Sequence, residues 1–201
     1  MVKATYISIC LFLMLFSLSS NYLVERNKQQ DKSSCTVTTP DVLGPYYRPD
    51  APIRANIRRD VDVNNLIEIK GVVKLNDCKT LLKDVTIEFW QANSTGSYDN
   101  DSEEFFYRAK LKTDSKGAYS LKTILPGRVM IDGKYLPAHI NFRVTSDFTE
   151  ELVSQLYFKG DPYLDPVVIQ SQKAFERIIQ LEETKTREKK GTFNIILKKK
   201  R

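Results

Sequence analysis

The chain has 201 residues, 41% of them hydrophobic, and a formal net charge of +6 at pH 7. This hydrophobic content is sufficient to bury one full core, so a single folded domain is the default expectation. Much of the basic excess lies in the last four residues, 198–201, which we interpret as a solvated basic tail. Because no nucleic-acid-binding motif accompanies this tail, we expect no nucleic-acid partner.

Residues 1–19 have the pattern of a secretory signal peptide. Lys3 supplies a positive start, Tyr6–Leu18 is an apolar run, and Ser17 and Ser19 supply the small residues of a cleavage site. The apolar run is shorter than the roughly 20 residues that a membrane-spanning helix needs. We therefore expect a secreted protein, extracellular or periplasmic, with no membrane association after the signal is removed. An uncleaved N-terminal anchor is the alternative.

The cysteines fit export. Cys10 would leave with the signal, and Cys35 and Cys78 would remain. An even pair of cysteines in an oxidising compartment predicts one disulfide bond. Such a bond would stabilise the fold by about 4 kcal/mol by restricting the unfolded chain. Two buried free thiols are the alternative.

Residues 20–37 are mostly polar and aperiodic, which predicts a flexible leader. The next run, Thr38–Tyr47, is rich in proline and glycine and cannot continue a regular element. Because Tyr46 and Tyr47 need burial, we expect this run to form an ordered arm. The folded domain is predicted to span 38–197, with a connecting segment at Asp50–Asn65.

From Leu66 onward the chain shows short β-strand patterns separated by turns. The predicted strands, about seven in number, lie at Ile67–Val73, Val85–Trp90, Tyr107–Thr113, Ala118–Thr123, His139–Thr145, Gln155–Phe158 and Thr192–Leu197. Asp114–Gly117 predicts a hairpin turn in which glycine supplies a positive φ. One amphipathic helix is predicted within Ser171–Glu183. Together these elements predict an all-β fold, an antiparallel β-sandwich with long loops and one short helix.

Three groups of motifs follow one another along the chain. They are Gly44-Pro45-Tyr46-Tyr47; then Glu88-Phe89-Trp90-Gln91-Ala92-Asn93 with Gly96-Ser97-Tyr98 and, later, Thr113-Asp114 and Gly117-Ala118-Tyr119; then Thr123–Gly127, Pro137-Ala138-His139-Ile140, Gln155–Phe158 and Gly160-Asp161-Pro162. Their order and spacing resemble the intradiol ring-cleavage dioxygenases, the catechol and protocatechuate dioxygenase family, over roughly Thr38–Leu197. The positions of Cys35 and Cys78 resemble those of the secreted branch of that family.

The resemblance implies a β-sandwich that holds a non-haem ferric ion, Fe(III), through two tyrosine phenolates and two histidines. It also implies that this iron activates a bound catecholate, whose ring O2 then cleaves between the two hydroxyl-bearing carbons. The ligand set is chemically sensible, because a hard trivalent cation prefers anionic oxygen ligands and two phenolates offset much of its charge.

The residue-by-residue match to this ligand set is incomplete. Tyr98 falls on the first tyrosine ligand and His139 on the first histidine ligand, whereas the second tyrosine position is Val129 and the second histidine position is Asn141. If His139–Thr145 is a strand, His139 and Asn141 leave the same face, because strand side chains alternate. A valine side chain has no atom that can coordinate a metal, and a neutral amide oxygen is a weak ligand for ferric iron. Loss of even outer partners typically costs about 10–100-fold in metal affinity, so a competent ferric site is not expected.

Three further residues are expected near the site. Leu136 replaces an arginine that, in the family, usually precedes Pro-Ala-His and helps to handle the substrate. Gln155 matches a polar residue near the family's active site, and Trp90 is expected in the core or in the wall of a cleft. Without the resemblance, a lone tyrosine in a turn is more often packed than ligated. A lone histidine on a strand is more often a structural residue.

Three functions remain open on the sequence. The first is a secreted family member whose degraded iron site leaves it weakly active or inactive, retained as a module that binds a small catechol-like aromatic or a protein. The second is a working dioxygenase whose altered ligand set is completed by Tyr135, Asn141 or water. The third is an extracellular scaffold that uses only the sandwich. The sequence does not fix the oligomeric state.

Overall fold

The computed structural model describes residues 36–171 and 173–200. The predicted signal peptide, most of the predicted leader and Cys35 lie outside these residues, so export and the Cys35–Cys78 disulfide stay predictions. Cys78 lies in a turn after Leu75, and the backbone amide of Cys78 donates to the Leu75 carbonyl at 3.0 Å. Within the described residues, no helix has both the length and the apolar character that crossing a bilayer requires.

The first sheet is built around its longest strand, β1 (Leu66–Leu75). This strand pairs antiparallel with β4 (Ala118–Ile124) and parallel with both β11 (Lys189–Thr192) and β12 (Ile195–Leu197). The short strand β10 (Glu182–Glu183) pairs with β11 at the edge. The sheet therefore has mixed pairing, which corrects the expectation of a wholly antiparallel sandwich.

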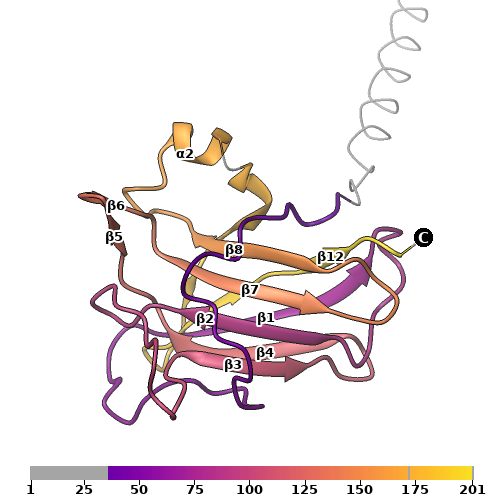
Figure 1. Cartoon of the computed structure of the whole chain (residues 1–201), viewed down its shortest axis with the longest axis horizontal. Helices are drawn as coiled ribbons and strands as arrows, with labels where there is room; N and C mark the ends of the chain where they lie inside the picture. The colour runs from indigo at the N-terminus through magenta and orange to yellow at the C-terminus, as the bar shows by residue number, and fades with distance from the viewer. Residues whose placement is uncertain (1–35, 172, 201) are drawn as a thin grey trace, which may run out of the picture. The chain divides into compact units, whose positions relative to one another are not determined.

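The second sheet has the strand order β3-β2-β7-β8-β9 and lies against the first (Figure 1). Its strands are β2 (Thr86–Gln91), β3 (Arg108–Lys112), β7 (His139–Thr145), β8 (Leu152–Phe158) and β9 (Ile178–Ile179). All pairs are antiparallel except β8 with β9. A small hairpin of β5 (Met130–Ile131) and β6 (Lys134–Tyr135) stands apart from both sheets. The predicted all-β sandwich is confirmed.

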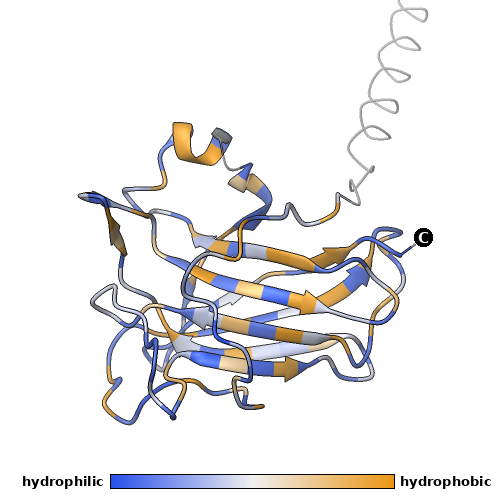
Figure 2. Cartoon of the chain, in the orientation of Figure 1, coloured by the Kyte–Doolittle hydropathy of each residue, from blue (hydrophilic) through white to orange (hydrophobic). Residues whose placement is uncertain are grey.

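The core lies between the sheets because alternate strand residues are apolar. Figure 2 shows hydrophobic and hydrophilic residues alternating along the strands. Ile67 and Ile69 of β1 face Phe89 of β2 and Phe142 of β7, and all four are buried. Burying each such side chain stabilises the fold by about 1.5–3 kcal/mol relative to leaving it exposed.

The outer face of the second sheet is polar, and the arm predicted at Thr38–Tyr47 covers it. At its start the Thr38 amide donates to the Ile196 carbonyl at 3.0 Å. Farther on, the Asp41 amide donates to the Val153 carbonyl at 2.8 Å. The arm then passes over β8, β7 and β2 (Figure 1), as expected for an ordered segment. It closes the space in which the outward-facing side chains of β2, β7 and β8 lie.

The turn Asp114–Gly117 forms as predicted but does not make a hairpin. Gly117 has a φ of +68°, and its amide donates to the Asp114 carbonyl at 2.9 Å. The flanking strands pair elsewhere, β3 with β2 and β4 with β1, so the turn carries the chain from one sheet to the other. The longer ladders to β1 and β2 decide these partners, and sequence alternation alone does not specify them.

A short helix is present as predicted, but its predicted position within Ser171–Glu183 is wrong. The structure has a short α-helix, α2 (Pro166–Ser171), and a single turn of 3-10 helix, η1 (Ala174–Arg177), followed by β9 and β10. The apolar residues spaced like a helical face have other roles: Phe175 is 70% exposed, and β9 pairs with β8. Strand pairing overrides the helical spacing here.

Gly71 marks the point where the first sheet is most sensitive to added volume. A Cβ atom at this position would lie 1.7 Å from the backbone oxygen of Phe193, the first of the two residues between β11 and β12. We expect Gly71→Ala to lower the free energy of unfolding by about 3 kcal/mol, because neither backbone can move without breaking its ladder. Urea denaturation measures the change, and exposed Lys122→Ala on β4 is the control, expected within about 0.5 kcal/mol. Equal stability of the two variants would contradict this close approach.

Candidate functional site

A cavity of about 140 Å³ lies between the arm and the outer face of the second sheet. The residues that line it are Val42, Leu43, Gly44, Pro45, Tyr46, Trp90, Tyr98, Val129, Ile131, Leu136, His139, Asn141 and Gln155. Strand register explains why three of these residues lie together: Trp90 of β2, Asn141 of β7 and Gln155 of β8 are direct neighbours across the sheet. His139, two residues before Asn141, leaves the same face. The structure therefore gathers around one cavity all seven residues that the sequence placed in or near an iron site.

Tyr98 is the centre of a hydrogen-bonded group in this cavity. Its hydroxyl lies 3.2 Å from His139 Nε2, and Asn141 Nδ2 donates to the same hydroxyl at 2.7 Å. His139 Nδ1 lies 2.7 Å from the carbonyl of Pro137. A carbonyl can only accept, so Nδ1 carries the proton and Nε2 accepts the proton of the Tyr98 hydroxyl. Asn141 Nδ2 also donates to the Trp90 carbonyl at 3.2 Å, which fixes the orientation of the amide.

Burial keeps both titratable groups of this cluster uncharged at neutral pH. It raises the pKa of Tyr98 to about 12, although the hydrogen bond from Asn141 acts in the opposite direction. It also lowers the pKa of His139, against the raising effect of the Pro137 carbonyl. The arrangement is therefore a neutral phenol that donates to a neutral imidazole.

The donor set does not fit a ferric ion held by two phenolates and two imidazoles. Val129, at the position of the second phenolate, is an apolar residue in the cavity wall. Asn141, at the position of the second imidazole, turns its Nδ2 donor toward Tyr98. Among the described residues there is no group of three or more His, Cys, Asp and Glu side chains placed to hold a metal ion. A single buried phenol with a raised pKa cannot offset three positive charges.

The arm contributes an aromatic lid over Tyr98. The rings of Tyr46 and Tyr98 stack with centroids 4.2 Å apart and planes inclined by 10°. The neighbouring Tyr47 packs edge-on against Trp90 at 5.1 Å. The Tyr47 hydroxyl is held between Glu88 Oε1, at 3.1 Å, and a guanidinium nitrogen of Arg143, at 3.0 Å. Tyr46 therefore covers the cavity, and Tyr47 attaches the arm to the sheet.

Arg108 holds the arm and the Tyr98 loop together, and sequence reasoning missed it. The residue is 1% exposed, and its guanidinium donates to the Tyr46 carbonyl at 2.7 Å and to the Asp99 carbonyl at 2.9 Å. These carbonyls belong to the stacked Tyr46 and to the residue after Tyr98. Burial lowers the pKa of Arg108 to about 10, with the Arg48 guanidinium adding to the effect, so it stays charged at neutral pH. A lone arginine at the start of a strand gives no sequence signal of such a role.

The other predicted pocket residues have simple positions. Gln155 Oε1 accepts a bond from the Tyr157 hydroxyl at 2.7 Å. Leu136 is half-buried in the cavity wall, and its amide donates to the Val129 carbonyl at 2.8 Å. Tyr135, considered as a substitute ligand, is 45% exposed, packs against Tyr163 at 5.4 Å and is not part of the cavity lining.

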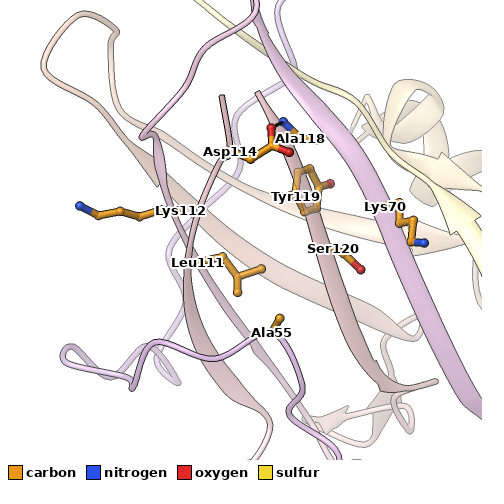
Figure 3. A pocket seen from close by; sticks show the side chains of 8 residues that line it. All are labelled: Ala55, Lys70, Leu111, Lys112, Asp114, Ala118, Tyr119 and Ser120. Carbon is orange, nitrogen blue, oxygen red and sulfur yellow. Dashed lines mark hydrogen bonds between the residues drawn. The ribbon is translucent and has the colours of Figure 1, made fainter. Parts of the chain in front are cut away.

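A larger and more open cleft lies at the edge of the sandwich between β3 and β4. Figure 3 shows Leu111 and Tyr119 at this cleft, with Lys70 and Lys112 extending away from each other at its rim. Its volume is about 370 Å³. Asp114, Ala118 and Tyr119 of its lining belong to the motifs, but it contains none of the residues expected in or near the iron site. The Tyr119 hydroxyl is used structurally, donating to the Phe193 carbonyl at 2.8 Å. We therefore place the candidate site at the Tyr98 cavity.

Comparison with known proteins gives a consistent family. The family model described as "Dioxygenase" matches residues 42–199. A chlorocatechol 1,2-dioxygenase from Cupriavidus pinatubonensis is 30% identical over 146 residues, which cover 63% of this chain and 57% of that protein. The chain thus spans less than two thirds of the length of the curated relative.

Solved structures give the same assignment. The dioxygenase domain of a dioxygenase carbohydrate-binding protein fusion from Streptomyces sp. SirexAA-E superposes with a TM-score of 0.70 at 26% identity, covering 81% of this chain and 99% of that one. A 3-chlorocatechol 1,2-dioxygenase from Rhodococcus opacus shares the fold, with a TM-score of 0.71 at 21% identity and coverage of 92% and 88%. With the family model covering most of the chain and the β-sandwich common to these structures, the chain belongs to the intradiol ring-cleavage dioxygenase family.

Proposed function

We propose that this protein is an exported member of the family that binds one catechol-like aromatic ring in the Tyr98 cavity without using ferric iron to cleave it. The observation that carries the proposal is the hydrogen-bonded group itself. The Tyr98 hydroxyl bonds to both His139, at 3.2 Å, and Asn141, at 2.7 Å, and Val129 supplies no metal-binding atom.

The size and walls of the cavity support binding of a single ring. A cavity of about 150 Å³ is sufficient to bind benzene in a protein interior, and this one is about 140 Å³. Tyr46 and Trp90 offer flat aromatic surfaces, and Val129 and Leu136 add aliphatic walls. Apolar walls with a few convergent polar groups are typical of small-molecule sites.

The chemistry of the donor set supports the absence of iron-dependent cleavage. Ferric iron would have to displace the proton of Tyr98, whose pKa burial raises to about 12. The one imidazole would have to give up the hydrogen bond that it accepts from Tyr98. No second phenolate would compensate for these losses, because Val129 occupies its position.

Iron loading and catechol binding, measured on the same purified sample, test the proposal. After incubation with ferric salt and desalting, we expect less than about 0.1 iron per chain and no visible charge-transfer absorption. Losing residues that would bind the iron directly should lower metal affinity by more than the 10–100-fold that losing outer partners costs. Calorimetry with catechol on metal-free protein should show binding, and an oxygen electrode should show no consumption.

Two results would overturn the proposal. A coloured protein with near-stoichiometric iron that consumes oxygen with catechol is a working dioxygenase, the activity named for the curated relatives. A metal-free protein that binds no aromatic ring is neither an enzyme of this class nor a module for such ligands. Export is tested separately, by N-terminal sequencing of the protein recovered outside the cell, which should start at residue 20 if the signal ends at Ser19.

A further inference from the structure

The cavity around Tyr98 is lined entirely by uncharged side chains. All of its lining residues belong to the described part of the chain, and none of them is Asp, Glu, Lys or Arg. The one titratable base in the lining, His139, has both ring nitrogens engaged, with Pro137 and with Tyr98. A ligand in this space therefore meets no residue of opposite charge.

Three arginines that bond to or directly precede lining residues are committed to other partners. Arg108 donates to two backbone carbonyls, as described above. Arg128 pairs with Asp161 at 3.0 Å, and Arg177 pairs with Asp41 at 2.7 Å. An anionic ligand would have to leave water without gaining an ion pair from any of these three arginines.

Two amide groups at the base of the cavity supply its remaining polar chemistry. Within the described residues Asn141 makes both of its side-chain bonds through Nδ2, which leaves Oδ1 as an acceptor. In the same part of the chain, Gln155 makes its one side-chain bond through Oε1, which leaves Nε2 as a donor. The two residues are direct partners on β7 and β8, so their Cβ atoms lie about 5 Å apart. A single hydroxyl placed between them can donate to Asn141 and accept from Gln155.

From this arrangement we infer that the site recognises a single hydroxyl group on an uncharged aromatic ring, whether or not the ring carries a second one, and that it rejects aromatic anions. The inference rests on the proposed ring-binding function and narrows its ligand class. A neutral phenol satisfies both amides and keeps its ring against Tyr46 and Trp90. An aromatic carboxylate loses its hydration and gains only neutral partners, which is unfavourable in a site of low polarity. A second hydroxyl on the ring has no further pair of amides to meet.

Ligand binding at pH 7 to metal-free protein tests the inference, with phenol, catechol, toluene and benzoate as probes. Trp90 is the chain's one tryptophan and lies in the cavity wall, so its fluorescence reports occupancy. We expect phenol and catechol to have dissociation constants within about threefold of each other. Toluene should bind several-fold more weakly than phenol, and benzoate at least about tenfold more weakly than phenol.

Benzoate binding as tightly as phenol would overturn the inference and leave the proposed ring-binding function intact. Catechol binding more than about tenfold more tightly than phenol would overturn it also, because the second hydroxyl would then be recognised. No binding of any ring would overturn the inference together with the proposed function.

A charge substitution gives a second readout. Leu136 is half-buried in the cavity wall, so Leu136→Arg would place a guanidinium beside the ligand. We expect this variant to bind benzoate about tenfold more tightly than the parent protein, with phenol affinity changed by less than about threefold. Leu136→Met is the matched control, because it keeps a long apolar side chain, and it should leave the preference for phenol unchanged. If Leu136→Arg and Leu136→Met bind benzoate equally, the absence of charge in the lining does not set the preference.

Discussion

The double substitution Val129→Tyr and Asn141→His is expected to convert the Tyr98 cavity into a ferric site. Val129 lines the same cavity as Tyr98, and Asn141 leaves the same strand face as His139, so the new side chains would complete two phenolates and two imidazoles. We expect the affinity for ferric iron to rise at least about 100-fold, since losing even outer partners costs about 10–100-fold. Iron content after desalting and visible charge-transfer absorption measure the result.

A matched control separates ligand chemistry from added volume. Val129→Phe with Asn141→His introduces the same ring without the hydroxyl, and it should remain colourless with little bound iron. Circular dichroism confirms that both double variants are folded. If the Tyr/His variant folds like the parent chain and still binds no iron, Val129 and Asn141 are not the positions that the missing ligands would occupy.

The sequence predicts those parts of the fold that depend on local pattern. Alternation in Val85–Trp90 and His139–Thr145 predicts strands there, and the structure has β2 and β7 at these positions. It does not predict the pairing of β1 with β11 and β12, which are parallel to it and distant in sequence. It also misassigns 171–183, where Ile178 and Ile179 are spaced as on a helix but pair with β8. In both cases contacts between distant segments decide the structure.

The candidate site divides in the same way. The shared face of His139 and Asn141 follows from the period of a single strand. The approach of Tyr98 to them, from a loop 41 residues before His139, rests on the family resemblance, because no local pattern specifies it. Arg108 could not be predicted, since its role exists only once the arm has crossed the sheet and brought the Tyr46 carbonyl within 2.7 Å.

Replacing Arg108 by methionine is expected to loosen the arm and the Tyr98 loop together. The substitution keeps an apolar side chain of similar length but leaves the carbonyls of Tyr46 and Asp99 without their charged donor. Hydrogen bonds to charged groups contribute about 1.5–3 kcal/mol each, so we expect the free energy of unfolding to fall by about 3 kcal/mol. For a chain of this size that corresponds to a melting temperature lower by about 10 °C, measured by calorimetry or circular dichroism.

A lysine at the same position distinguishes the geometry of the guanidinium from its charge. Arg108→Lys keeps the positive charge, but one ammonium group cannot reproduce the fork that reaches both carbonyls, so we expect about half of the destabilisation. Both variants should also weaken phenol binding at temperatures where they are fully folded, because the Tyr46–Tyr98 stack that covers the cavity loses its anchor.

Lys112→Met, on the exposed part of the same strand, is the control, expected to change stability by less than about 0.5 kcal/mol. Full stability of Arg108→Met would mean that the arm is held by its other contacts, chiefly the bonds of Tyr47 to Glu88 and Arg143. Loss of stability with unchanged phenol binding would mean that the stacked tyrosines do not form the cover of the site.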